Sequence, residues 1–216
     1  MIEIESIQIK ENHALVALST GESLPIPHGS VKIYDITPGK VIDHDEYGRL
    51  KGESDRFVCY RRALQYLSMR GRSVAELERY LLGKGHSRRH VQESTARLAE
   101  LGYLDDYAYA MEHIGKRRGR RAVGKNRLLA ELFRKGVPGD VARRAVAEYP
   151  GELVDPEELY RLAAEKFARL KGKRDAVRKL VFFLRQRGFE GDEIRRAVER
   201  LSDGGVVKPI WLLTMT

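Results

Sequence analysis

Cysteine, tryptophan and long apolar runs are scarce in this 216-residue sequence, which contains one cysteine, Cys59, and one tryptophan. A single cysteine cannot form an intramolecular disulfide, so a disulfide-stapled secreted scaffold is excluded. No stretch approaches the roughly 18 uninterrupted apolar residues that a membrane span needs. The first ten residues include Glu3 and Glu5 and lack the continuous apolar core of a signal peptide. We therefore expect a cytoplasmic protein with no membrane partner.

Recognisable catalytic and metal-binding motifs are also missing. Residues 119–126 nearly match a phosphate-binding loop, but asparagine replaces the hydroxyl residue that ligates magnesium, and no buried strand precedes the loop. His86 and His90 supply two ligands with arginines between them, which does not make a zinc site. Asp105 and Asp106 precede a helical segment and are typical of an N-terminal cap. We therefore expect no catalytic residue, no metal, no cofactor and no enzymatic activity.

Charge is plentiful and unevenly distributed. The chain has 40 Lys and Arg against 31 Asp and Glu, a formal net charge of +9. Residues 1–55 hold five basic and ten acidic side chains, whereas residues 56–216 hold 35 and 21. An acidic head followed by a basic body indicates a polyanionic or acidic partner for the body, because solubility alone does not require this separation.

The head has the sequence pattern of a small β-rich element. Apolar and polar residues nearly alternate over residues 2–9, and a second apolar run covers residues 14–18, so both are predicted strands. Residues 24–28 are too rich in proline for a central strand. Residues 31–36 fit either a further strand or a short turn of helix. A segment of about 55 residues can bury only a small hydrophobic core by itself, so we expect the head to pack against the body.

A motif of two leucines and a glycine recurs in the body at intervals of 51 and 52 residues. The three copies are Leu77, Leu81 and Gly85; Leu128, Leu132 and Gly136; and Leu180, Leu184 and Gly188. Leucines four residues apart form an apolar stripe on a helix, and the glycine can adopt the left-handed conformation at the helix C-terminus. The sequence of residues 143–146 also recurs at 195–198. The body is therefore predicted to contain three related units.

Each unit is predicted to be three helices, the first beginning near Arg56. The second helix of the first unit opens with Ser73 and Glu76, which have the spacing of a capping box. We expect a mostly α protein in which three tandem three-helix repeats form an elongated curved array behind a small β-rich N-terminal extension. The expected domains are the extension (1–55), the repeats (56–105, 106–154 and 155–203) and a C-terminal tail (204–216).

Basic residues cluster between the first and second helix of each predicted unit. Residues 116–127 contain seven cations and no acid. If the units stack, these turns align into one positive ridge that binds an anionic partner; the alternative is a solvated charged surface. The candidate binding residues are Lys116, Arg117, Arg118, Arg120, Arg121, Lys125 and Arg127 in the second unit, Lys171, Lys173 and Arg174 in the third, and Arg70 and Arg72 in the first.

One stretch carries a resemblance to a known family. Residues 98–106 read Leu-Ala-Glu-Leu-Gly-Tyr-Leu-Asp-Asp and are followed by Tyr-Ala-Tyr-Ala; Lys135, Gly136 and Val137 lie downstream. With this signature, residues 57–203 resemble the RecX family of bacterial regulators of the RecA recombinase, and the head resembles the β-rich extension of some members. The sequence departs from the family at Val123 and Gly124, and in its apolar tail.

The resemblance implies a monomeric, non-enzymatic regulator that binds the RecA filament on single-stranded DNA. It also implies inhibition of the recombinase, ATPase and coprotease activities of RecA, and so modulation of DNA repair and the SOS response. A second hypothesis is a helix-turn-helix-like regulator that acts directly on DNA. Asparagine and glutamine, which are common readers of base edges, are few near the basic turns, and this favours the first hypothesis.

Overall fold

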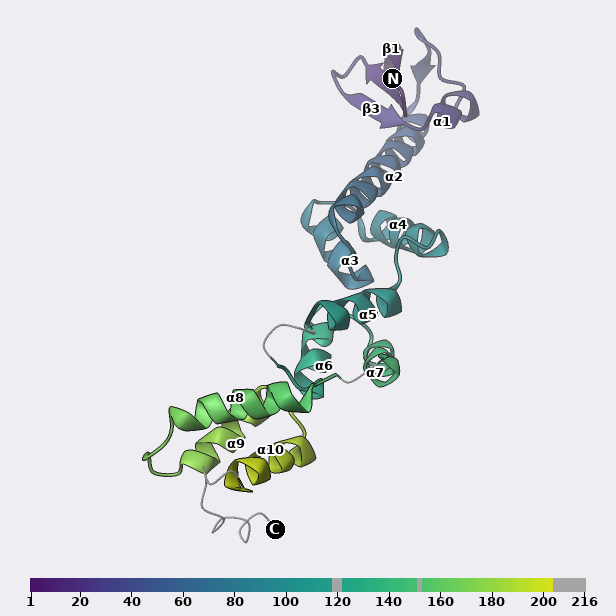
Figure 1. Cartoon of the computed structure of the whole chain (residues 1–216). Coiled ribbons are helices and arrows are strands. Elements are labelled where there is room, and N and C mark those ends of the chain that lie inside the picture. The colour runs from purple at the N-terminus through teal and green to yellow at the C-terminus, as the bar shows by residue number, and fades with distance from the viewer. Residues whose placement is uncertain (118–121, 151–152, 204–216) are drawn as a thin grey trace. The chain divides into compact units, whose positions relative to one another are not determined.

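The computed structural model describes residues 1–117, 122–150 and 153–203. In these residues the chain forms four strands and ten helices (Figure 1). The chain divides into two compact units, Met1–Leu104 and Asp105–Thr216. The first unit contains the β-rich head and the first three-helix repeat, and the second unit contains the other two repeats.

The head is a four-stranded antiparallel sheet with the strand order β3-β2-β1-β4. The strands are β1 (Ile2–Ile9), β2 (Ala14–Leu18), β3 (Ser23–Ile26) and β4 (Val41–Ile42), and the short helix α1 (His28–Ile33) follows β3. The first two predicted strands are confirmed. Pro25 lies in the edge strand β3, where a missing backbone N–H is tolerated. For residues 31–36 the sequence left a strand or a turn of helix open. Residues 31–33 form the end of α1, so the helical alternative is confirmed for this part.

Helix α2 (His44–Met69) joins the head to the first repeat without a break. The predicted helix start near Arg56 is wrong, because the helix begins twelve residues earlier at a capping box. Asp43 Oδ1 accepts a hydrogen bond from the Glu46 amide at 2.8 Å, and Glu46 Oε2 accepts one from the Asp43 amide at 3.1 Å. Leu50 of α2 is buried in the core of the head, so the helix contributes to the head's core as well as to the repeat.

Three three-helix repeats follow one another, as predicted, and each has its own hydrophobic core. The helix C-terminal glycines Gly85, Gly136 and Gly188 have φ of +85°, +81° and +83°. These left-handed conformations confirm the helix ends predicted at the three glycines. The leucines that precede the glycines are buried, as predicted. The first repeat is α2, α3 (Val74–Gly83) and α4 (Arg88–Glu100); the second is α5 (Asp106–Arg117), α6 (Lys125–Arg134) and α7 (Gly139–Glu148); the third is α8 (Pro156–Ala168), α9 (Ala176–Gln186) and α10 (Gly191–Asp203).

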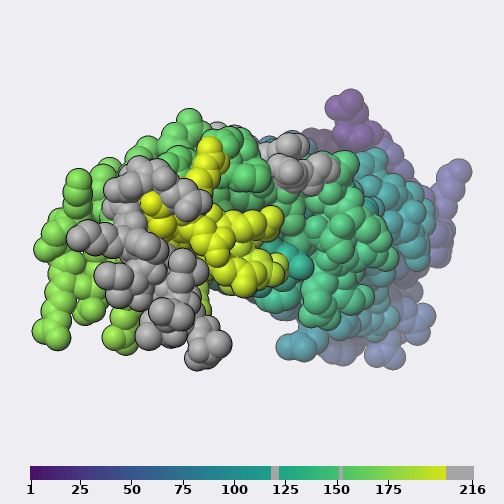
Figure 2. Space-filling view, turned by 60° about the horizontal axis from the view of Figure 1, so that its bottom comes forward, coloured from purple at the N-terminus to yellow at the C-terminus, as the bar shows by residue number. Residues whose placement is uncertain are grey.

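The third repeat packs α10 against both α8 and α9. Figure 2 shows α10 in yellow beside the light green surface of the other two helices. Its core contains Leu159, Phe167, Leu184 and Leu201. The mostly helical fold of tandem three-helix repeats behind a small antiparallel sheet is therefore confirmed.

A backbone contact joins the second and third repeats. The amide of Gly124, the N-cap of α6, donates to the Arg187 carbonyl at 2.9 Å, and the Asn126 amide donates to the Gly188 carbonyl at 3.1 Å. A Cβ atom on Gly124 would lie 2.2 Å from the carbonyl carbon and oxygen of Gly188. These amides belong to the segment that resembles a phosphate-binding loop. Because they already bond the third repeat, and because α5 precedes them, the loop interpretation fails here.

Candidate functional site

The cations of the second repeat lie at the two sides of the α5–α6 connection. Lys116 and Arg117 end α5, and Lys125 and Arg127 open α6. Arg118, Arg120 and Arg121, which complete the predicted cluster, lie outside the described residues. Arg117 was expected in an open turn, but it is the last residue of a helix and its guanidinium is engaged by a carboxylate.

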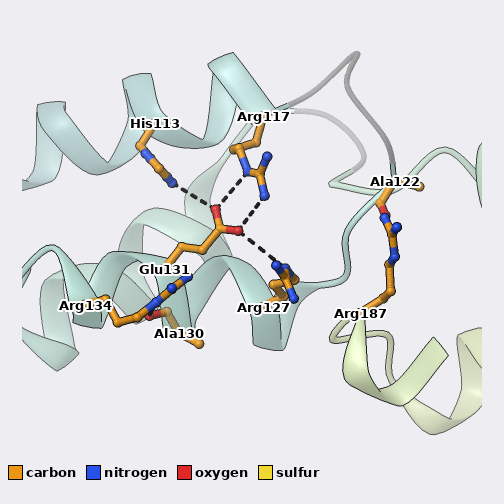
Figure 3. Close-up of polar contacts among 8 residues, drawn as sticks. All are labelled: His113, Arg117, Ala122, Arg127, Ala130, Glu131, Arg134 and Arg187. Atoms are coloured by element: carbon orange, nitrogen blue, oxygen red, sulfur yellow. Dashed lines mark hydrogen bonds and ion pairs between the residues drawn. The ribbon is translucent and has the colours of Figure 1, made fainter. Parts of the chain in front are cut away.

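Glu131 of α6 is the carboxylate that holds Arg117 (Figure 3). Arg117 Nε donates to Glu131 Oε2 at 2.8 Å, and Nη2 donates to Oε1 at 2.5 Å. Arg127 Nε lies 3.5 Å from Oε1, and His113 Nε2 lies 3.2 Å from Oε2. The Glu131 side chain is 10% exposed, and that of Arg117 is 26% exposed. A nearly buried acid thus gathers three basic side chains from α5 and α6.

The protonation of Glu131 is set by two opposed effects. Burial alone would raise the pKa of its carboxyl group, because a charge is costly away from water. Hydrogen bonds and charges of Arg117 and His113 act the other way and outweigh burial, so the pKa of Glu131 lies below its ordinary value. The carboxylate is therefore charged at neutral pH, and the cluster is an ion-pair network.

We expect this network to lose its stabilising effect in acid. A carboxyl group whose pKa is lower in the folded state stabilises the fold above its unfolded value of 4.5, and that stabilisation is lost as the pH falls through the folded pKa. Glu131→Gln should therefore be less stable than the natural chain by about 1–3 kcal/mol at pH 7. The difference should shrink steadily below pH of about 4.5. Urea denaturation of both proteins from pH 3 to pH 7 measures it, and a constant difference would contradict the assignment.

The other predicted cations of the second repeat are held more weakly. Lys116 Nζ lies 2.5 Å from Glu112 Oε1, and Lys125 Nζ lies 3.6 Å from Glu190 Oε1, all four side chains being well exposed. Exposed ion pairs contribute little, so both lysines can exchange their carboxylate for a phosphate. In the first repeat, Arg70 is the exposed C-cap residue of α2.

Arg72 is held by an aromatic ring. Its guanidinium carbon lies 4.1 Å from the centre of Tyr66, whose ring stacks on Tyr80 at 3.8 Å. The guanidinium of Arg72 is therefore placed over a ring of the first repeat, whereas the sequence predicted it to be a candidate for binding an anionic partner.

The turn between α8 and α9 carries the exposed cations of the third repeat. Lys171, Lys173 and Arg174 are exposed, and none has a carboxylate partner in the part of the chain that the structure describes. Lys173 is tied to the end of α8 through its backbone, whose amide donates to the Leu170 carbonyl at 2.9 Å. Among the predicted binding residues that the structure describes, the three in this turn are exposed and have no carboxylate partner. Alignment of the three turns into one ridge stays a prediction.

The side chains considered for catalysis have structural surroundings. His86 Nε2 lies 3.3 Å from Arg62 Nη1, and burial lowers the pKa of His86. Asp105 Oδ1 accepts hydrogen bonds from the Tyr107 and Ala108 amides at 2.8 and 3.0 Å, so the predicted N-terminal cap is confirmed. Burial raises the pKa of the Cys59 thiol. Among residues 1–117, 122–150 and 153–203, no three His, Cys, Asp or Glu side chains gather in a way that could hold a metal ion.

The described helices include none that is both long and apolar enough to cross a membrane.

Glu131 is the residue that sequence reasoning missed. It stands one position before Leu132 of the repeated motif, where the other repeats have Tyr80 and Phe183. An acid in place of an aromatic residue, next to a leucine of the buried stripe, is the signal that could have revealed it. Such an acid needs partners, and Arg117 and His113 supply them.

Comparisons with known proteins show which proteins this chain resembles in sequence and in fold. A family model described as "RecX, first three-helix domain" matches residues 59–98, which span parts of α2 and α4 and all of α3. The regulatory protein RecX of Chlorobium limicola is 39% identical over 145 residues, which cover 66% of this chain and 89% of that protein.

Two solved structures have a similar fold. A crystal structure of regulatory protein RecX matches with a TM-score of 0.75 and 18% identity, over 92% of this chain and 100% of that chain. The crystal structure of RecX from Lactobacillus salivarius matches with a TM-score of 0.61 and 25% identity, over 68% of this chain and 97% of that chain. The first match covers so much of the chain that it includes most of the β-rich head, so the head and the repeats occur together elsewhere.

Proposed function

This chain belongs to the RecX family of regulatory proteins, and we propose that it regulates the RecA recombinase by binding the RecA filament on single-stranded DNA. Binding would inhibit strand exchange, ATP hydrolysis and the coprotease activity of RecA, and so modulate DNA repair and the SOS response. The observation that carries the proposal is the 39% identity to a regulatory protein RecX over 145 residues. The chain itself is expected to have no catalytic activity and to act in the cytoplasm.

The exposed cations support a target that contains nucleic acid. Lys171, Lys173 and Arg174 stand on one turn with no carboxylate partner among the described residues, as phosphate-binding side chains do. Lys116 and Lys125 are held only by exposed acids, which a phosphate can replace. Arg117 and Arg127 share the carboxylate of Glu131, so we assign them to the fold of the second repeat and not to the partner.

Titration of RecA ATPase tests the proposal. We expect the rate of ATP hydrolysis on single-stranded DNA to fall at least five-fold as the full chain is added. Replacing Lys171, Lys173 and Arg174 together with alanine should weaken this effect. If each of these side chains contacts a phosphate, the affinity of the variant for the RecA filament should depend less on salt. The slope of log affinity against log salt should fall by about two units in total, at roughly 0.7 for each contact. Unchanged ATP hydrolysis at saturating chain would contradict the proposal.

A matched control removes equal charge elsewhere. Arg89, Arg97 and Arg195 are exposed and paired with acids on their own helices, so their replacement with alanine should leave inhibition unchanged. Footprinting on duplex DNA separates the second hypothesis from the first. A short sequence-specific footprint without RecA would favour a helix-turn-helix-like regulator that acts directly on DNA.

A further inference from the structure

One pair of facing positions is filled differently in each repeat. The first position lies three residues after a fully buried alanine of the first helix, and the second lies one residue before the second leucine of the repeated motif. The pairs are Tyr66 and Tyr80, stacked at 3.8 Å; His113 and Glu131, 3.2 Å apart; and Lys166 and Phe183, with Nζ 4.7 Å from the ring centre. The third repeat therefore has a cation over an aromatic ring where the first has two stacked rings and the second has a histidine beside a carboxylate.

A half-open groove of about 340 Å³ lies beside this pair in the third repeat. We call it the α8–α9 groove. Phe183 lines it from α9, and Lys166 and Arg169 line it from α8. Arg187 also lines it, lies 5.2 Å from the Phe183 ring centre, and donates from Nη1 to the Ala122 carbonyl at 3.4 Å. Figure 3 shows Arg187 reaching from the end of α9 to Ala122. Ala122, which also lines the groove, therefore lies close to Arg187.

The groove carries net positive charge. Four cations line it, against the two carboxylates Glu158 and Glu165, and Glu158 is paired with Arg161 at 3.9 Å. Arg169 is exposed. The exposed cations of the α8–α9 turn, Lys171, Lys173 and Arg174, follow soon after α8, so the positive charge continues along the chain from the groove.

An aromatic ring beside cations in a half-open groove matches the chemistry of a single-stranded nucleic acid. Unpaired bases stack on aromatic side chains, and the backbone phosphates between them are attracted to lysine and arginine. The bases of a duplex are already stacked and cannot reach the ring. An acidic peptide without aromatic residues would use the cations but would leave the Phe183 ring without a stacking partner. The volume of the groove lies at the lower end of small-ligand sites, which suits a single nucleotide.

We propose that the α8–α9 groove binds a nucleotide of single-stranded DNA, with the base displacing Lys166 Nζ from the Phe183 ring and the phosphates bound by Lys166 and Arg169. This inference rests on the proposed function and deepens it, because it makes the DNA strand a direct ligand of the third repeat. Direct binding to DNA in the absence of RecA separates the two ideas.

Fluorescence anisotropy with a labelled 20-nucleotide oligothymidine and the full chain, without RecA, tests the groove. We expect Phe183→Leu to weaken binding roughly ten-fold, since stacking on one base contributes about that much. Phe183→Trp should restore it. Phe182→Leu is the matched control, because Phe182 is exposed on the same helix but does not line the groove. The affinity of this variant for the oligothymidine should equal that of the natural chain. Equal affinity of the Phe183→Leu and Phe182→Leu variants would overturn the proposal.

A second variant keeps the test valid if Phe183→Leu does not fold. Lys166→Gln with Arg169→Gln should lower the slope of log affinity against log salt by about 1.4 units, at roughly 0.7 for each phosphate contact. An unchanged slope would overturn the proposal, as would equal competition by polyglutamate and by unlabelled oligothymidine. If the groove binds DNA as expected while RecA ATPase is unaffected, the proposed function fails and the groove stands. If the chain inhibits RecA and neither inhibition nor DNA binding depends on Phe183, the proposed function stands and the groove proposal fails.

Discussion

Gly124→Ala is expected to destabilise the protein by about 3 kcal/mol or more, because its new Cβ atom has no space. That atom would lie 2.2 Å from the carbonyl carbon and oxygen of Gly188 and 2.3 Å from the amide nitrogen of Phe189. All three are backbone atoms of the third repeat, so no flexible side chain can move away. The φ of Gly124 is −80°, which any residue adopts, so the cost is steric and not conformational.

Hydrogen exchange measures the effect where it occurs. The amides of Gly124 and Asn126 donate to carbonyls of the third repeat, so both should lose protection in the variant while the first repeat keeps its own. Gly52→Ala is the matched control. Gly52 lies inside α2 with open space around its Cβ position, so this substitution should stabilise the chain by about 0.5–1 kcal/mol. Equal stability of the two variants would refute the backbone contact.

Glu131→Ala is expected to cost about 3 kcal/mol, because it leaves the Arg117 guanidinium with no carboxylate in a largely buried site. The substitution also removes the hydrogen-bonding partner of His113. Chemical denaturation at pH 7 gives the magnitude. Glu93→Ala is the matched control, since Glu93 pairs with Arg89 on an exposed face of α4, and its loss should cost less than about 1 kcal/mol.

A repeat swap tests the same cluster from the other side. Glu131→Phe combined with His113→Lys places in the second repeat the pair that the third repeat has at Phe183 and Lys166. If the three pairs of facing positions are equivalent, this double variant should recover part of the stability lost in Glu131→Ala, even though Arg117 stays without its acid. A double variant no more stable than Glu131→Ala would argue against the equivalence.

Local patterns predicted most of the fold. The alternation in residues 2–9 and the repeated leucines and glycines depend on neighbours along the chain, and both gave the correct elements. The start of α2 was missed because Gly48 and Gly52 resemble a boundary, although Asp43 and Glu46 have the capping spacing that would have placed it. The preference of glycine against helices is weaker than a capping box combined with burial of Leu50 in the head.

The candidate site was harder to predict because charge pairing is not local. Residues 116–127 contain no acid, yet the acid that binds Arg117 is fourteen residues downstream. Glu190, which pairs with Lys125, comes from a different repeat. The sequence therefore shows where the basic residues are, but it does not distinguish those that form ion pairs within the fold from those that are available to a partner. That separation depends on which helices pack together, and among the described candidates it leaves Lys171, Lys173 and Arg174 without a carboxylate partner.

Helix α2 has a consequence for recognition by a large partner. Its 26 residues extend about 39 Å at the usual rise, and one end is anchored in the sheet while the other belongs to the first repeat. The continuous helix therefore fixes the distance between the head and the first repeat. A partner with repeating subunits could be met by both surfaces in one register only. Since no hinge has to be ordered between them, their joint association would avoid the entropy loss that a flexible linker brings.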